Sequence, residues 1–154
     1  MSYNQYFLQY TGAYTIDKNT FILNTKWGET YNIDGDFNDI QDFNSFFRLG
    51  GLFSLSGLPS NAITGNNVAF TSLLYRYPLS KDDFFGKFTM PLYAGMSLEA
   101  GSAWYGDSAF SKDKILYGGS IYISADTVLG PFYLGFGTTE FDYYSIHISL
   151  GKSF

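Results

Sequence analysis

Residues 143–154 alternate between large apolar side chains and small or polar ones. The large apolar positions are Tyr144, Ile146, Ile148, Leu150 and Phe154, and the positions between them hold Ser145, His147, Ser149, Gly151 and Ser153. A period of two predicts a β-strand with one apolar face and one polar face. Because the segment ends on an aromatic residue, it is typical of the closing strand of an outer-membrane β-barrel.

The same alternation recurs along most of the chain. It predicts strands over residues 3–16, 20–31, 66–78, 88–104, 114–126, 132–137 and 143–154. Most of these exceed the roughly 5–6 residues of a globular strand and reach the about 9–11 that a tilted membrane strand needs. The polar positions are rich in Gly and Ser, as in the crowded interior of a small barrel. We therefore expect an all-β fold, an antiparallel transmembrane β-barrel with seven clear strands, as one domain over residues 1–154.

The odd strand number poses a problem for closure. Single-chain bacterial barrels have even numbers of strands, and an open sheet edge is not tolerated in lipid. An eighth strand is therefore expected if the chain closes alone. Two alternatives stay open, namely a fragment of a larger barrel and protomers that pair edge to edge.

Residues 32–64 interrupt the alternation and predict a long extracellular loop. Its first part is acidic, with Asp34, Asp36, Asp39 and Asp42. These carboxylates could bind calcium, but their spacing does not follow the EF-hand pattern, so we expect a solvated loop and no metal site. The second part is apolar and Gly-rich, and loops of this length are uncommon. We expect that part to fold back into the barrel or onto a partner.

Composition narrows the class further. The chain has no cysteine, so disulfides and thiolate chemistry are excluded. Its aromatic content of 21% fits a barrel flanked by aromatic girdles. A net charge of -5 argues against nucleic acid as a partner.

Three ionisable residues are expected to face the interior: Lys26, Glu99 and His147. A lysine in mid-strand would cost roughly 2–4 kcal/mol on a lipid face, and a buried carboxylate needs a partner. We take an Arg48–Glu99 pair as a hypothesis.

A lipase built on His147 and a neighbouring serine was weighed against a simple filling role. Side chains two positions apart on a strand have Cβ atoms about 6–7 Å apart. That separation is too large for the direct hydrogen bond that a nucleophile and its base need. We therefore expect His147 to fill the interior, and we expect no enzyme and no cofactor.

Five segments, taken in order, carry a family resemblance. They are residues 46–58 (FFRLGGLFSLSGL), 75–78 (YRYP), 95–104 (GMSLEAGSAW), 125–137 (ADTVLGPFYLGFG) and 149–154 (SLGKSF). The set resembles the bacterial surface-antigen superfamily of outer-membrane β-barrels, which includes the barrel-assembly insertase and two-partner secretion transporters. Within it, the chain looks most like the C-terminal barrel of patatin-like outer-membrane phospholipases.

The resemblance implies roles for particular residues. The start of the family's loop motif corresponds to Phe47, Arg48, Leu49, Gly50 and Gly51, its tip to Leu55, Gly57 and Leu58, and the C-terminal assembly signal to Ile146, Ile148, Leu150 and Phe154. Family members carry an arginine at the position of Ser56, which pairs with acids inside the barrel. Here Leu74 occupies one acid position and Glu99 keeps the other. The charged lock is thus expected to be lost, which puts a carried-over translocation mechanism in doubt.

The resemblance also implies a function. It implies a small non-enzymatic barrel of the bacterial outer membrane that acts in insertion or translocation of membrane proteins or other substrates, as an oligomer. The alternative is a structural or anchoring segment of a larger patatin-like phospholipase, without transport. The implied partners are membrane lipids, further copies of the chain, and the barrel-assembly machinery during biogenesis.

Overall fold

The computed structural model describes residues 3–32, 47–79, 91–105 and 115–151. Its strands are β1 (Tyr3–Ile16), β2 (Asn19–Asn32), β3 (Phe47–Leu49), β4 (Ile63–Gly65), β5 (Asn67–Leu79), β6 (Leu92–Trp104), β7 (Leu116–Thr127), β8 (Gly130–Thr139) and β9 (Tyr143–Leu150). None of the described segments forms a helix long and apolar enough to cross a membrane. The all-β prediction is confirmed.

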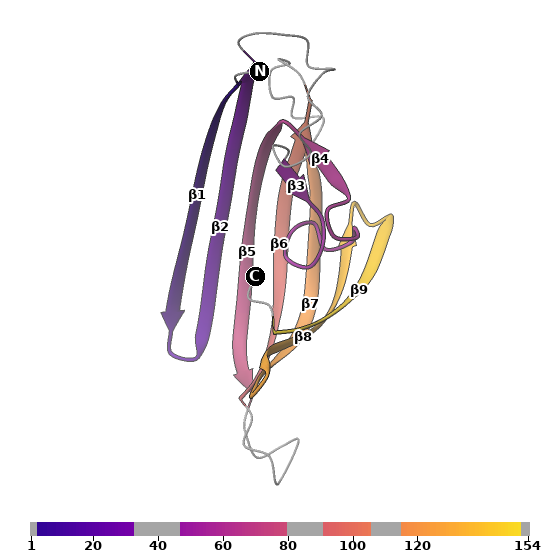
Figure 1. The fold of residues 1–154 in the computed structure, drawn as a ribbon. Coiled ribbons are helices and arrows are strands. Elements are labelled where there is room, and N and C mark those ends of the chain that lie inside the picture. Colours follow the sequence, from indigo (N-terminus) through magenta and orange to yellow (C-terminus); the bar gives the residue numbers. More distant parts are fainter. Residues whose placement is uncertain (1–2, 33–46, 80–90, 106–114, 152–154) are drawn as a thin grey trace.

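Seven long strands form one antiparallel sheet in the order β1-β2-β5-β6-β7-β8-β9, and β3 pairs with β4 in a separate two-stranded sheet. The seven strands predicted from the alternation are therefore confirmed. The sheet curves, and β3, β4 and the turn between them lie against one of its faces (Figure 1). We call this the inner face and the opposite one the outer face.

Closure of the sheet into a barrel stays a prediction. Within the described residues the sheet contains no eighth strand, and β1 and β9 are its two edges. Every neighbouring pair is antiparallel. After six reversals β1 and β9 run in the same direction, so these two edges could meet only as parallel strands.

The outer face is apolar across the whole sheet. One row of cross-strand partners takes an apolar residue from each long strand in turn: Tyr14, Phe21, Tyr75, Met96, Ile121, Phe136 and Ile146. We call this set the apolar row. Six gaps between strands spaced about 4.8 Å apart make it about 29 Å wide. It is open to the surroundings, with Ile121 63% and Ile146 70% exposed.

The inner face carries small and polar residues. The row next to the apolar row holds Ala13, Ile22, Leu74, Ser97, Ser120, Gly137 and Ser145. The described turn between β3 and β4 covers this face over β5–β9, so Ser97 and Ser120 are buried there. The inner side of β1 stays exposed.

The C-terminal strand is shorter than predicted. The alternation predicts a strand over 143–154, but β9 ends at Leu150. Gly151 adopts a left-handed backbone with φ of 75° and donates its N–H to the Pro131 carbonyl of β8 at 2.9 Å. Phe154 of the expected assembly signal, and the four aspartates of the acidic segment, lie outside the described residues.

Candidate functional site

The β3–β4 hairpin presents the turn over residues 50–62, which we call the docked loop. Gly50 and Gly51 open it with φ of 123° and 100°, a conformation that glycine adopts without a steric penalty. Phe53 and Leu55 also have positive φ, 66° and 70°, at about 1–2 kcal/mol each. Their burial, with 8% and 0% of the residue exposed, offsets that cost. We expected this apolar segment to fold back into the barrel or onto a partner, and it packs on one face of the chain's own sheet.

The tip of the docked loop is held by the carboxylate of Glu99 on β6. Ser56 donates its backbone N–H to Glu99 Oε2 at 2.6 Å and its hydroxyl to Oε1 at 2.5 Å. Ser97 donates a further hydroxyl to Oε1 at 2.5 Å. Glu99 is only 4% exposed, and hydrogen bonds to a charged group are stronger than neutral ones, about 1.5–3 kcal/mol each. Two serine hydroxyls and one serine N–H therefore supply the hydrogen bonds that the Glu99 carboxylate accepts.

This arrangement corrects the predicted Arg48–Glu99 pair, which is wrong. The described contacts of Glu99 are Ser56 and Ser97, and Arg48 lies exposed on β3. Alternation along β3 turns Leu49 to the sheet and Arg48 away from it. In place of the predicted Arg48 guanidinium, the neutral residue Ser56 of the docked loop binds Glu99.

Two residues from the far strands complete the loop's anchorage. His147 on β9 has its Nε2 2.7 Å from the Ser56 carbonyl oxygen, a contact in which the imidazole N–H donates. The Gly57 N–H donates to the Thr139 hydroxyl at 3.0 Å. His147 therefore does more than fill space, since it binds the loop backbone directly.

Glycines make the close approach possible. A Cβ on Gly137 would lie 2.3 Å from the Ser56 carbonyl oxygen and 2.3 Å from the Ser56 Cβ. A Cβ on Gly57 would lie 2.0 Å from the Thr139 nitrogen. Neither distance is physically accessible, so loop and strand touch backbone to backbone only because both carry glycine.

Apolar side chains seal the loop on both sides of this polar centre. Leu49, Leu55 and Leu58 form one buried cluster with Val68 and Phe70 on β5. A second cluster joins Leu52 and Phe53 to Leu74 and Tyr122. The Phe53 ring meets the Tyr122 ring edge-on, with centroids 4.7 Å apart.

The hairpin is tied to the first strand as well. Phe7, whose position breaks the alternation of β1, stacks on Phe47 of β3 with centroids 5.5 Å apart. A Cβ on Gly28 would lie 2.3 Å from the Phe47 ring, so β2 leaves room for that ring. The irregular position of Phe7 thus has a partner that the sequence did not identify.

The remaining predicted interior residue also faces inward. Lys26 lies on the inner face, with its Nζ 5.8 Å from the centre of the Phe70 ring. The outward positions on either side of it, Thr25 and Trp27, are exposed. The prediction that Lys26 points away from the apolar face is confirmed.

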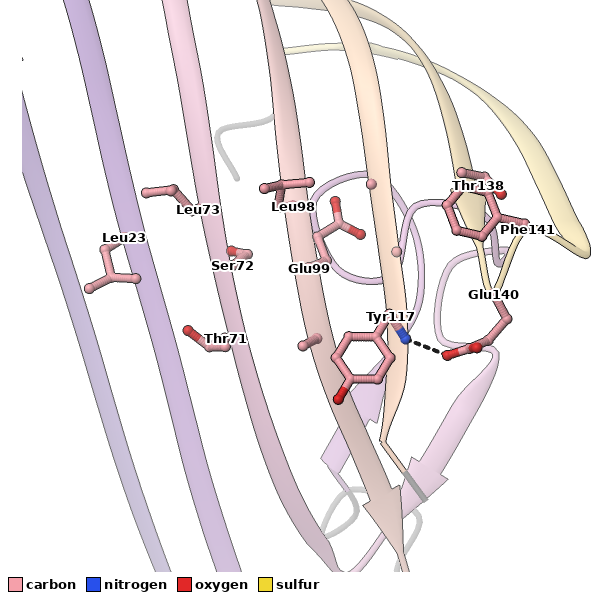
Figure 2. Close-up of a pocket in the computed structure, with 13 residues that line it drawn as sticks. Leu23, Thr71, Ser72, Leu73, Leu98, Glu99, Tyr117, Thr138, Glu140 and Phe141 are labelled. Atoms are coloured by element: carbon pink, nitrogen blue, oxygen red, sulfur yellow. Dashed lines mark hydrogen bonds between the residues drawn. The ribbon is translucent and has the colours of Figure 1, made fainter. Parts of the chain in front are cut away.

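The outer face is hollowed next to the apolar row. A cavity of about 550 Å³ lies over β5–β7 and is walled by Leu73, Leu98, Tyr117 and Phe141 (Figure 2). At its edge, Glu140 accepts the Tyr117 N–H at 2.6 Å. Its surface is apolar like the rest of the outer face, so it belongs to the same exposed region.

The polar contacts at the tip of the docked loop hold the loop against the sheet. The Ser56 hydroxyl donates to Glu99 and accepts the Phe53 N–H at 2.9 Å, while the His147 imidazole reaches the Ser56 carbonyl and not its hydroxyl. The imidazole–hydroxyl hydrogen bond of a Ser/His pair is therefore not formed between His147 and Ser56. The described segments also hold no group of three or more His, Cys, Asp or Glu side chains that could bind a metal ion.

No protein-family model matches this chain, and it has no significant match among curated proteins.

Proposed function

We propose that this chain is an integral outer-membrane β-barrel protein whose outer face lies against lipid. It acts in the insertion or translocation of membrane proteins or other substrates and has no enzymatic activity of its own. The observation that carries the proposal is the apolar row. Soluble monomers rarely expose a contiguous apolar patch larger than a few hundred Å², and larger patches mark interaction or membrane surfaces.

The distribution of aromatic side chains on the outer face supports a membrane environment. Trp27 and Tyr117 lie on one side of the apolar row, and Tyr77 lies on the other. All three are exposed, by 41%, 60% and 40%. Aromatic residues at both ends of an apolar band are typical of the two membrane interfaces.

The open edges favour an assembly of several copies. In lipid every backbone N–H and C=O must be paired, so the free sides of β1 and β9 need partners. Further copies of the chain can supply them, and a lone sheet of seven strands cannot. The mass of the protein in a neutral detergent tests this, with two or more chains per particle expected and a stable single chain contradicting it.

The alternative is an anchoring barrel segment of a larger patatin-like phospholipase. The docked loop favours it, because the loop covers the inner face over β5–β9 and is held there by Glu99 and His147. A barrel whose interior is filled by the loop does not conduct substrates, whereas a membrane anchor needs no pathway for them.

Folding assays separate these two functions. The protein is folded into phospholipid vesicles, and an unfolded outer-membrane barrel of another type is then added. An insertase shortens the folding time of the added barrel relative to empty vesicles, while an anchor leaves it unchanged. Vesicles carrying a heat-denatured sample of the same protein are the control.

A further inference from the structure

A second cavity lies on the inner face, beside the docked loop. It has a volume of about 270 Å³ and is enclosed by β1, β2 and β5 on the sheet side and by residues 52–54 of the loop. Ligand sites for drug-sized molecules span about 300–1,000 Å³. The cavity therefore suits a smaller occupant than those.

One buried hydroxyl without a hydrogen-bond partner lines this cavity. Ser72 is 2% exposed, and its Oγ has no hydrogen-bond partner. Leaving a buried hydroxyl unsatisfied costs about 1–3 kcal/mol. Beside it, Asn24 accepts a hydrogen bond from the Thr11 hydroxyl through its Oδ1 at 2.8 Å. This bond does not use the amide N–H groups of Asn24, which also lines the cavity.

The charge at the cavity is positive although the chain as a whole carries -5. Lys26 and Arg76 both line the cavity, and the lining includes no Asp or Glu among the described residues. Each cation rests on an aromatic ring, with Lys26 Nζ 5.8 Å from the Phe70 ring centre and the Arg76 guanidinium 4.5 Å from that of Tyr93. Neither forms an ion pair within the described part of the chain.

One buried carboxylate, that of Glu99, lies close to this cavity and is bound by donors of the loop and the sheet. Glu99 is the cross-strand neighbour of Ser72, but its oxygens accept hydrogen bonds from Ser56 and Ser97. It is not part of the cavity lining.

The rest of the wall is apolar. Ile22 and Leu74 line the sheet side, and Leu52 and Phe53 line the loop side. On the inner face, the cross-strand pair Ile22–Leu74 lies next to the cross-strand pair Asn24–Ser72. Lys26 lies at one end of this series and Arg76 at the other, so the cavity has a donor-rich end at Lys26, Asn24 and Ser72, an apolar middle, and a second cation beyond Leu74.

We propose that this cavity binds a small amphiphilic anion, whose carboxylate or phosphate head group is bound by Lys26, Asn24 and Ser72 and whose short apolar chain packs between Leu74 and the loop residues Leu52 and Phe53. A head group with acceptor oxygens would satisfy the Ser72 hydroxyl and meet the Lys26 ammonium. The inner face alone carries this site, so it does not depend on the outer face meeting lipid.

The test titrates carboxyl-¹³C decanoate into the full chain in dodecyl maltoside micelles and follows the carboxylate by NMR, with protein-free micelles as the blank. Decanoate is expected to saturate one site. Loss of one charge-assisted hydrogen bond corresponds to about ten- to hundredfold weaker binding, which we expect for Lys26→Gln. Lys18→Gln, in the exposed β1–β2 turn, is the matched control and should bind as the unmodified protein does.

Ser72→Ala gives a second readout that a purely structural role would not produce. It should weaken decanoate binding and at the same time raise the urea midpoint of the ligand-free protein, because it removes an unsatisfied buried hydroxyl. Unlabelled decanol and acetate serve as competitors, and both should displace decanoate at least tenfold less well than unlabelled decanoate. Equal displacement by decanol, or unchanged decanoate binding in both Lys26→Gln and Ser72→Ala, would overturn the proposal.

Discussion

A lysine placed in the middle of the apolar row tests the environment of the outer face. Ile121 is the sixth of the twelve residues of β7, is 63% exposed, and has apolar cross-strand partners in Met96 and Phe136. On a lipid-facing strand, Lys near the bilayer midplane costs about 2–4 kcal/mol. In water the same exposed substitution would change the free energy of unfolding by no more than about 0.5 kcal/mol.

The expected effect of Ile121→Lys is therefore a loss of about 2–4 kcal/mol, which lowers the folding equilibrium constant by roughly 1.5 to 3 orders of magnitude. Reversible urea unfolding from phospholipid vesicles, followed by tryptophan fluorescence, measures it. Val128→Lys is the matched control, because Val128 is equally apolar but lies in the β7–β8 turn and is fully exposed at 103%. Near an interface the cost falls to about 0–1 kcal/mol. If Ile121→Lys stays within about 0.5 kcal/mol of the unmodified protein, the outer face does not meet lipid.

Three further substitutions test how the loop is held, each by urea unfolding and by the rate of chymotrypsin cleavage within the loop. Glu99→Gln should destabilise the protein by about 1–3 kcal/mol, since an amide cannot accept all three hydrogen bonds, whereas Glu140→Gln at the exposed β8–β9 turn should have little effect. Gly137→Ala should release the loop and speed cleavage severalfold, because its Cβ would meet Ser56 at 2.3 Å, while Gly12→Ala meets only the movable Tyr10 hydroxyl at 2.7 Å. His147→Ala should remove one hydrogen bond, about 0.5–1.5 kcal/mol. Because we expect the unmodified protein to have no lipase activity, the substitution should remove none. Loop cleavage at the unmodified rate in both Glu99→Gln and Gly137→Ala would contradict this account of docking.

The strands could be predicted from the sequence because their two faces differ so consistently. Side chains alternate with a period of two, and in each long strand one phase is apolar. The strands β3 and β4 have three residues each, too few to establish a period, and so they were missed. The described part of β9 ends at Leu150, where Gly151 has a positive φ that the alternation of side chains does not reveal.

The docked loop was predicted in outline and missed in its contacts. Its apolar composition indicated burial, but its position on β5–β9 depends on glycines of β8 that come together with Ser56 only in the fold. The search for a charged partner led to Arg48, although a backbone N–H and two hydroxyls satisfy Glu99 equally well. Ser56 was the available signal, since the resemblance predicts that it occupies the position of the arginine in the family's lock.

The two tryptophans of the chain give the most direct measurement of the central proposal, that the outer face meets lipid. Trp27 lies on the outer face and is 41% exposed, whereas Trp104 is 7% exposed. The variants Trp104→Phe and Trp27→Phe each leave one fluorophore, which is read in vesicles of brominated phospholipid against unbrominated ones. We expect bromine to quench Trp27 strongly and Trp104 weakly. Trp27 fluorescence that brominated lipid leaves unchanged, but that aqueous acrylamide quenches, would contradict the account.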